Sequence, residues 1–264
     1  MERKIEDVTE LPAIENITEF PNEILWKIFG YLSNYDVLRN VAQVSKKFHE
    51  LTQDQFLISK IEVDTGSWYK GTKSEPMPLT EQEKEKYCND LLGVCKRSRK
   101  LTFFSLTLDG WNLGPQNQPK IVKALPLMDH QFLEEFCLKS RYLDSLDENT
   151  LKYLHQCPNL KILKFEFKCG DFLCNAVRFS MISKVNNNFE HENLEELHLI
   201  GLGLDLEKSA FKKSLETIVG NFPKLQYLYL SFLYIRNSFY EYCEICEKIA
   251  SEKKIKIRTY PFKK

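Results

Sequence analysis

The sequence lacks an excess of charge of either sign, long apolar runs and cofactor motifs. Its 264 residues include 37 basic and 37 acidic side chains, so electrostatics give no case for nucleic acid or an anionic membrane as a partner. No apolar run approaches the roughly 20 residues of a membrane span, and we expect a soluble chain. A glycine-rich phosphate loop is also missing, because Gly110 and Gly114 flank a Trp-Asn-Leu turn and open no helix. We therefore expect no cofactor.

The eight cysteines and five histidines complete no recognisable metal or catalytic site. Cys243 and Cys246 have the spacing of half a zinc site, but a structural zinc needs four ligands, and Cys169 and Cys174 lie far away in the sequence. Buried small hydrophobic residues explain Cys243 and Cys246 more simply. No histidine stands in the Cys-His or Ser-His context of an activated nucleophile. We expect no metal, no catalytic residue and no enzymatic activity.

The N-terminal residues 1–16 carry five acidic and two basic side chains and no apolar signal-peptide region. This composition predicts a short disordered lead. Without a secretory signal, the cysteines are expected to be free thiols in a reducing compartment, which means the cytoplasm, the nucleus or both. The basic run at 96–100 could be a localisation or nucleic-acid patch, but cations are also favoured where a helix ends.

The segment 17–57 has the pattern of three short helices. Pro21 suits the first turn of the first helix, and Gly30 marks its end. At about 100° per residue, the apolar side chains of this helix fill an arc of roughly 160°, whereas an ordinary surface helix needs a stripe of about 100°. A piece of roughly 40 residues cannot bury that much apolar surface by itself, so we expect a partner that covers it. The arc consists of Ile24, Leu25, Ile28, Phe29, Tyr31 and Leu32.

This segment resembles an F-box, the motif that docks a substrate receptor onto the Skp-type adaptor of a Skp–cullin–F-box ubiquitin ligase. The family pattern of Leu-Pro, Glu, Ile-Phe, Leu, Asp-Leu and Val-Cys-x-x-Trp is met by Phe20-Pro21, Glu23, Ile28-Phe29, Leu32, Asp36-Val37, Val44-Ser45 and Phe48. The departures are Phe20 for Leu, Ser45 for Cys and Phe48 for Trp. The alternative is an ordinary three-helix piece of a larger core. The resemblance implies that the adaptor contacts Phe20, Pro21, Ile24, Leu25, Ile28, Phe29, Leu32, Val37, Leu38 and Val41.

Beyond this segment, one phrase of the form Leu-x-x-apolar-x-apolar recurs five times. Its last two apolar positions are two residues apart, which is the period of a strand with one buried face. The phrases begin at Leu101, Leu133, Leu160, Leu194 and Leu225. Residues 58–64 alternate like a further strand, and residues 255–257 give a last turn of the pattern. Helices are expected between phrases: one opens at a capping box of Thr80 and Glu83, and others span 151–155, 211–219 and 239–250.

The order of helix, turn with proline and Leu-rich phrase is similar to that of the leucine-rich repeats that follow F-boxes. The phrases recur every 27 to 34 residues, against about 20–29 for the class, and none has the consensus Asn or Cys after its last apolar position. We expect an α/β fold: a three-helix F-box at 17–57, then an irregular leucine-rich-repeat solenoid at 58–264 with alternating helices and short parallel strands. The alternative for the second part is a generic α/β domain.

In such a solenoid, the residues between the apolar positions line a concave parallel sheet. Mixed charge with aromatic side chains suits a protein or peptide ligand. The residues expected to contact a target are Ser105, Cys137, Lys164, His198, Tyr227 and Tyr229.

Together these patterns predict a non-enzymatic substrate receptor. The F-box would bind a Skp-type adaptor and, through it, a cullin, and the repeats would bind a target protein of unknown identity. One rival is an F-box/leucine-rich-repeat interaction scaffold that acts outside a cullin ligase. The other is a cysteine- or histidine-dependent hydrolase, which only the presence of reactive residue types supports.

Overall fold

The computed structural model describes residues 16–32, 36–37, 40–52, 59–64, 80–97, 100–108, 130–140, 148–167, 190–203, 207–234 and 239–261. The predicted domain boundary at 57/58 and residues 1–15 of the predicted lead lie outside these ranges. None of the helices in the described part has the length and apolar character to cross a membrane.

The first described elements are short helices: η1 (Ile17–Glu19), α1 (Asn22–Phe29), η2 (Val41–Gln43) and α3 (Lys46–Thr52). Pro21 is the N-cap of α1, and its carbonyl oxygen accepts the backbone N–H of Ile24 at 3.0 Å. Gly30 ends α1 as expected. The first and third predicted helices are therefore present.

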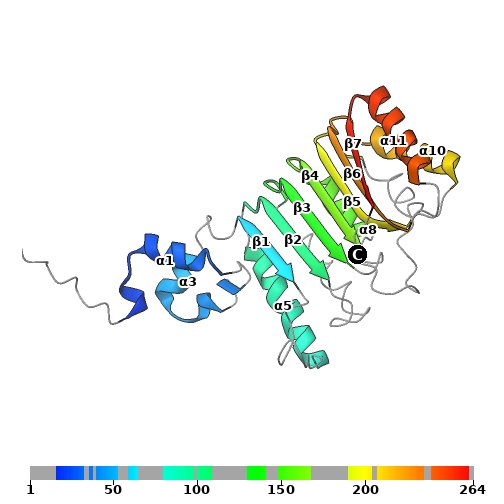
Figure 1. Cartoon of the computed structure of the whole chain (residues 1–264). Helices are drawn as coiled ribbons and strands as arrows, with labels where there is room; N and C mark the ends of the chain where they lie inside the picture. Colours follow the sequence, from blue (N-terminus) through cyan, green and yellow to red (C-terminus); the bar gives the residue numbers. More distant parts are fainter. Residues whose placement is uncertain are drawn as a thin grey trace, which may run out of the picture.

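The rest of the described chain forms a seven-stranded parallel sheet with helices (Figure 1). The strands are β1 (Lys60–Asp64), β2 (Phe103–Leu108), β3 (Glu135–Ser140), β4 (Ile162–Phe167), β5 (Glu196–Gly203), β6 (Tyr227–Tyr234) and β7 (Lys256–Pro261). Their order in the sheet follows the chain from β1 to β7. The predicted α/β class is confirmed, and each of the five phrases leads into one of the strands β2 to β6.

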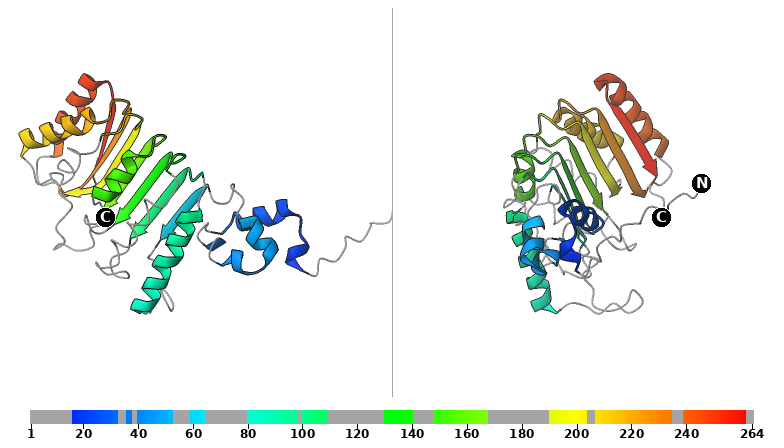
Figure 2. Two further views of the ribbon diagram at one scale, coloured as in Figure 1. Left: turned by 180° about the vertical axis from the view of Figure 1, so that it is seen from behind. Right: turned by 90° about the vertical axis from the view of Figure 1, so that its left-hand side faces the viewer.

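The described helices that follow β1 in the chain all lie on the same face of this sheet (Figure 2). They are α5 (Glu81–Arg97), α8 (Glu148–His155), α10 (Lys208–Gly220) and α11 (Phe239–Lys253). At the start of α5, Thr80 N–H donates to Glu83 Oε2 at 2.9 Å and Glu83 N–H donates to Thr80 Oγ1 at 3.3 Å, so the predicted capping box forms. We call the opposite face of the sheet the open face, since no described helix covers it.

The hydrophobic core lies between the sheet and these helices. Every second side chain of β2 and β4 is buried, which is the period that the phrases predicted. Phe104 of β2 and Leu163 of β4 belong to the same cluster as Leu154 of α8, Phe211 of α10 and Ile249 of α11, and all five are at most 1% exposed. One face of each strand is thus buried in the core, and the residues between the buried ones point to the open face.

Side chains that the sequence patterns did not reveal join the turns before neighbouring strands. Asn159 Nδ2 donates to the carbonyl oxygen of Gln131 at 2.6 Å, and Asn193 Nδ2 donates to that of Pro158 at 2.7 Å. Lys224 Nζ donates to Asn193 Oδ1 at 2.7 Å. These bonds lie before the strands, whereas the consensus asparagine follows them. Asn159 and Asn193 each precede the first leucine of a phrase, which is the signal that could have revealed them.

A buried histidine completes this arrangement. His191 Nε2 donates to the carbonyl oxygen of Cys157 at 2.8 Å, and Nδ1 accepts the N–H of Asn193 at 3.2 Å. These partners require the neutral ring with its proton on Nε2. The side chain is 5% exposed, and burial lowers the pKa of His191 below its ordinary value of 6.5.

We expect the stability of the sheet to fall at mildly acidic pH because of His191. A histidine whose pKa is lowered in the folded state takes up its proton more readily when unfolded, so stability is lost as the pH drops below about 6.5. Urea unfolding at pH 7.5 and pH 5.5 measures the loss. His191→Gln keeps a donor for Cys157 but cannot titrate. The loss of stability between the two pH values should therefore be smaller in this variant than in the wild type. An equal loss in both proteins would mean that other groups cause it.

Candidate functional site

The short N-terminal helices enclose a small core of their own. Leu25 and Phe29 of α1 pack with Val37 and with Phe48 and Leu51 of α3, and all five side chains are at most 7% exposed. The rings of Phe29 and Phe48 meet edge to face with centroids 5.1 Å apart. In the free chain Leu25, Phe29 and Val37 therefore support the domain from inside, and their contact with the adaptor stays a prediction.

The other four side chains of the apolar arc lie on the surface, two of them in α1 and two in the turn that follows it. Ile24, Ile28, Tyr31 and Leu32, which we call the apolar stripe, have exposed fractions of 38%, 36%, 92% and 43%. The arc is wider than the domain's own core, as expected, so a continuous row of apolar side chains remains in solvent. Such a row on a small domain is typical of a protein interface.

The other predicted adaptor contacts fall into three groups. Pro21 is exposed, whereas Phe20 and Val41 pack partly against the small core. Leu38 lies outside the described residues. Ile17 and Val44, which the contact prediction did not include, are 47% and 65% exposed.

Lys47 of α3 fixes the chain that leads into α1. Its Nζ donates to the carbonyl oxygens of Thr18 at 2.6 Å and Phe20 at 3.0 Å. These bonds join residues 27 and 29 positions apart, and no local pattern in the sequence reveals them. A single charged side chain therefore holds Thr18 and Phe20, which precede the apolar stripe, in place.

Replacing Lys47 with methionine should loosen this domain. The change keeps much of the apolar stem but removes two hydrogen bonds from a charged donor, which together stabilise the domain by about 1.5–3 kcal/mol. Hydrogen exchange of the α1 and α3 amides should become faster, and exchange in β3 to β5 should stay unchanged. Lys47→Arg, which keeps the charge, is the control. Unchanged exchange in Lys47→Met would show that these bonds contribute nothing.

The open face carries the residues predicted to contact a target. Strand register places Ser105, Cys137, Lys164, His198 and Tyr229 in one row across β2 to β6. The same row continues to Glu62 on β1 and Arg258 on β7, which the prediction did not include. Tyr227 belongs to the neighbouring row. Target contact by these residues stays a prediction, and Cys137 offers little surface because it is 7% exposed.

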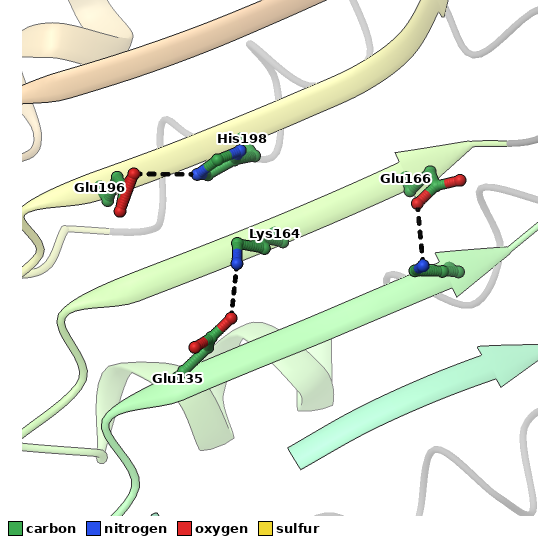
Figure 3. A network of polar contacts seen from close by, with 6 residues as sticks. Glu135, Lys164, Glu166, Glu196 and His198 are labelled. Atoms are coloured by element: carbon green, nitrogen blue, oxygen red, sulfur yellow. Dashed lines mark hydrogen bonds and ion pairs between the residues drawn. The ribbon is translucent and has the colours of Figure 1, made fainter. Parts of the chain in front are cut away.

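Acidic and basic side chains in the middle of the open face pair with one another (Figure 3). Lys164 Nζ lies 2.6 Å from Glu135 Oε1, and Lys139 Nζ lies 3.3 Å from Glu166 Oε2. Each pair joins β3 to β4. These cations are therefore neutralised within the sheet.

His198 lies beside these pairs on β5. Its Nε2 is 3.3 Å from Glu196 Oε1. Burial lowers the pKa of His198 despite the opposing effect of the Glu196 carboxylate. The lowered pKa favours the neutral ring, which stacks on Tyr229.

Three of the described thiols have pKa values that are raised, which makes them less reactive. Burial raises the pKa of Cys157 and of Cys246 to about 12, and also raises that of Cys137. Cys246 is buried as expected, whereas Cys243 is half-buried with Sγ 3.4 Å from Thr259 Oγ1. Within the described ranges, no three His, Cys, Asp or Glu side chains are grouped so that they could hold a metal ion.

Comparison with known proteins identifies the N-terminal part. Residues 17–62 match the family model described as F-box-like. The chain carries an F-box-like domain. The match contains the apolar stripe, the small core and Lys47, and such domains generally bind Skp-type adaptors. No family model confirms the leucine-rich repeats, and no curated protein matches the chain.

Proposed function

We propose that this protein is a substrate receptor of a Skp–cullin–F-box ubiquitin ligase. The apolar stripe on α1 and the turn after it carries the proposal, because an F-box-like domain exposes there the surface that an adaptor would bury. The adaptor would cover Ile24, Ile28, Tyr31 and Leu32. Leu25 and Phe29, which pack in the small core, would hold α1 in position. The receptor would act in the cytoplasm, the nucleus or both.

The sheet would serve as the second binding site. Seven parallel strands in chain order, with the described helices on one face, are what stacked leucine-rich repeats would produce, and this supports an irregular solenoid of that class. The open face would hold the target protein. The chain itself would make or break no bond, since holding a lysine of the target near the activated ubiquitin raises its effective concentration.

Reconstitution tests this proposal. The full chain, a purified Skp-type adaptor and a cullin should elute together from a size-exclusion column in equal amounts. A complex with the adaptor alone would favour a scaffold that acts outside a cullin ligase. If neither protein joins the chain, the proposal is wrong.

A further inference from the structure

The end of the open face formed by β5 to β7 is built from aromatic rings in register. The rings of His198 and Tyr229 stack with centroids 4.1 Å apart and planes at 14°. Tyr227 and Tyr229 lie nearly parallel, with centroids 6.5 Å apart and planes at 16°. All three side chains are half-buried. They therefore form a continuous, preordered surface across two strands.

Two cations on the edge strand extend this surface. Lys256 Nζ lies 5.1 Å from the ring centroid of Tyr227, and Arg258 Cζ lies 5.8 Å from that of Tyr229. Both side chains are exposed. We call Tyr227, Tyr229, Lys256 and Arg258, together with His198, the aromatic–cationic cluster.

The two cations of this cluster differ from those in the middle of the same face. Lys164 and Lys139 are each paired with a glutamate. Among the described residues, no carboxylate lies within ion-pair distance of Lys256 or Arg258. Their side chains contact tyrosines instead: Lys256 Nζ lies 3.5 Å from Tyr227 Oη, and the two cations lie over the rings of Tyr227 and Tyr229. The unmatched positive charge of the open face is thus concentrated at its β7 end.

The charges along the central row also favour one orientation of a ligand that lies across the strands. Glu62 stands at the β1 end of the central row, and Arg258 stands at its β7 end. A ligand that crosses the strands would meet opposite charges at its two ends. Nucleic acid is disfavoured, because the carboxylates of Glu135, Glu166 and Glu196 share the face and the chain as a whole has no net charge.

We propose that the aromatic–cationic cluster docks an acidic segment of polypeptide, with an aspartate or glutamate carboxylate held between Lys256 and Arg258. This inference rests on the proposed function, since it names the chemistry of the target that the open face would hold. Arginine binds a carboxylate through two parallel hydrogen bonds, and tyrosine rings give a large contact area at low entropic cost. Cations already placed over rings lose little further freedom on binding.

Selection from a displayed library of random dodecapeptides tests the inference. The full wild-type chain should enrich peptides rich in aspartate and glutamate. Lys256→Glu and Arg258→Glu should remove that enrichment. Lys60→Glu is the matched control, because Lys60 occupies the same register row as Lys256 at the opposite end of the sheet, and this variant should still enrich acidic peptides.

A selected peptide is then synthesised and its affinity measured by fluorescence anisotropy. Charge reversal at Arg258 should weaken binding at least about tenfold, as should replacement of the peptide's acidic residues by their amides. Selection of basic or purely apolar peptides by the wild type overturns the inference. So does acidic enrichment that persists in both Lys256→Glu and Arg258→Glu, or that is lost equally in Lys60→Glu.

Adaptor capture, measured on the same preparations, separates this inference from the proposed function. Lys256→Glu and Arg258→Glu should capture the adaptor as the wild type does. Normal adaptor capture without acidic selection would reject the acidic segment alone. Failure of the wild type to capture the adaptor would reject the proposed function.

Discussion

Ile28→Asp should abolish capture of a Skp-type adaptor and leave the parallel sheet folded. Ile28 is 36% exposed in the free chain, so its replacement keeps contact with solvent there. In the complex the new carboxylate would be buried against apolar surface, which costs several kcal/mol. A cost of about 3 kcal/mol already weakens binding more than about a hundredfold. Pull-down with the purified adaptor, followed by titration calorimetry, measures the effect.

Two further variants make this test specific. Leu32→Asp, also on the apolar stripe, should act in the same way, whereas Ile28→Val should bind nearly as well as the wild type because it keeps the surface apolar. Undiminished capture by Ile28→Asp would show that the adaptor binds elsewhere. Loss of cooperative unfolding of the sheet in the same variant would contradict two separate hydrophobic cores.

Gly201→Ala should destabilise the sheet by at least about 3 kcal/mol, which corresponds to a fall in Tm of roughly 6–12 °C. Gly201 lies in β5 where the register against β6 shifts, and its φ is +82°. A Cβ there would overlap the carbonyl oxygen of Phe167 on the neighbouring strand and lie 3.0 Å from its carbonyl carbon. Backbone would have to move, because no flexible side chain can give way. Thermal unfolding followed by circular dichroism measures the change.

Gly220→Ala is the matched control for this prediction. Gly220 is the last residue of α10, and a Cβ there would meet nothing within 4 Å. Alanine is favoured over glycine in a helix, so the stability should change by no more than about 1 kcal/mol, in the stabilising direction. Equal effects of the two substitutions would contradict the close approach of β4 to β5. Gly201→Ala should still capture the adaptor, since the small core around Phe29 and Phe48 is separate.

The elements that the sequence predicted best are those with a local cause. The Leu-x-x-apolar-x-apolar phrases predicted the parallel strands, because a strand with one buried face must alternate. The pair of Thr80 and Glu83 predicted the start of α5, because its two reciprocal bonds depend only on residues three apart. The row through Lys164 and His198 followed from the phrases for the same reason.

The details that the sequence could not supply depend on partners far along the chain. The sequence showed the width of the apolar arc, but Phe48 and Leu51 of α3 decide that Leu25 and Phe29 are the side chains that turn inward. Gly201 needs its positive φ only because Phe167 of the adjacent strand lies so close. That Arg258 has no glutamate opposite it, whereas Lys164 does, can be seen only from the register of the strands.

Hydrogen–deuterium exchange of the full wild-type chain, with and without the purified adaptor, tests the central claim most directly. The account predicts slower exchange over residues 22–32, which contain the apolar stripe, and no change in β2 to β7. Protection confined to the sheet, or spread over both parts, would contradict an adaptor site on α1 that leaves the open face free for a target.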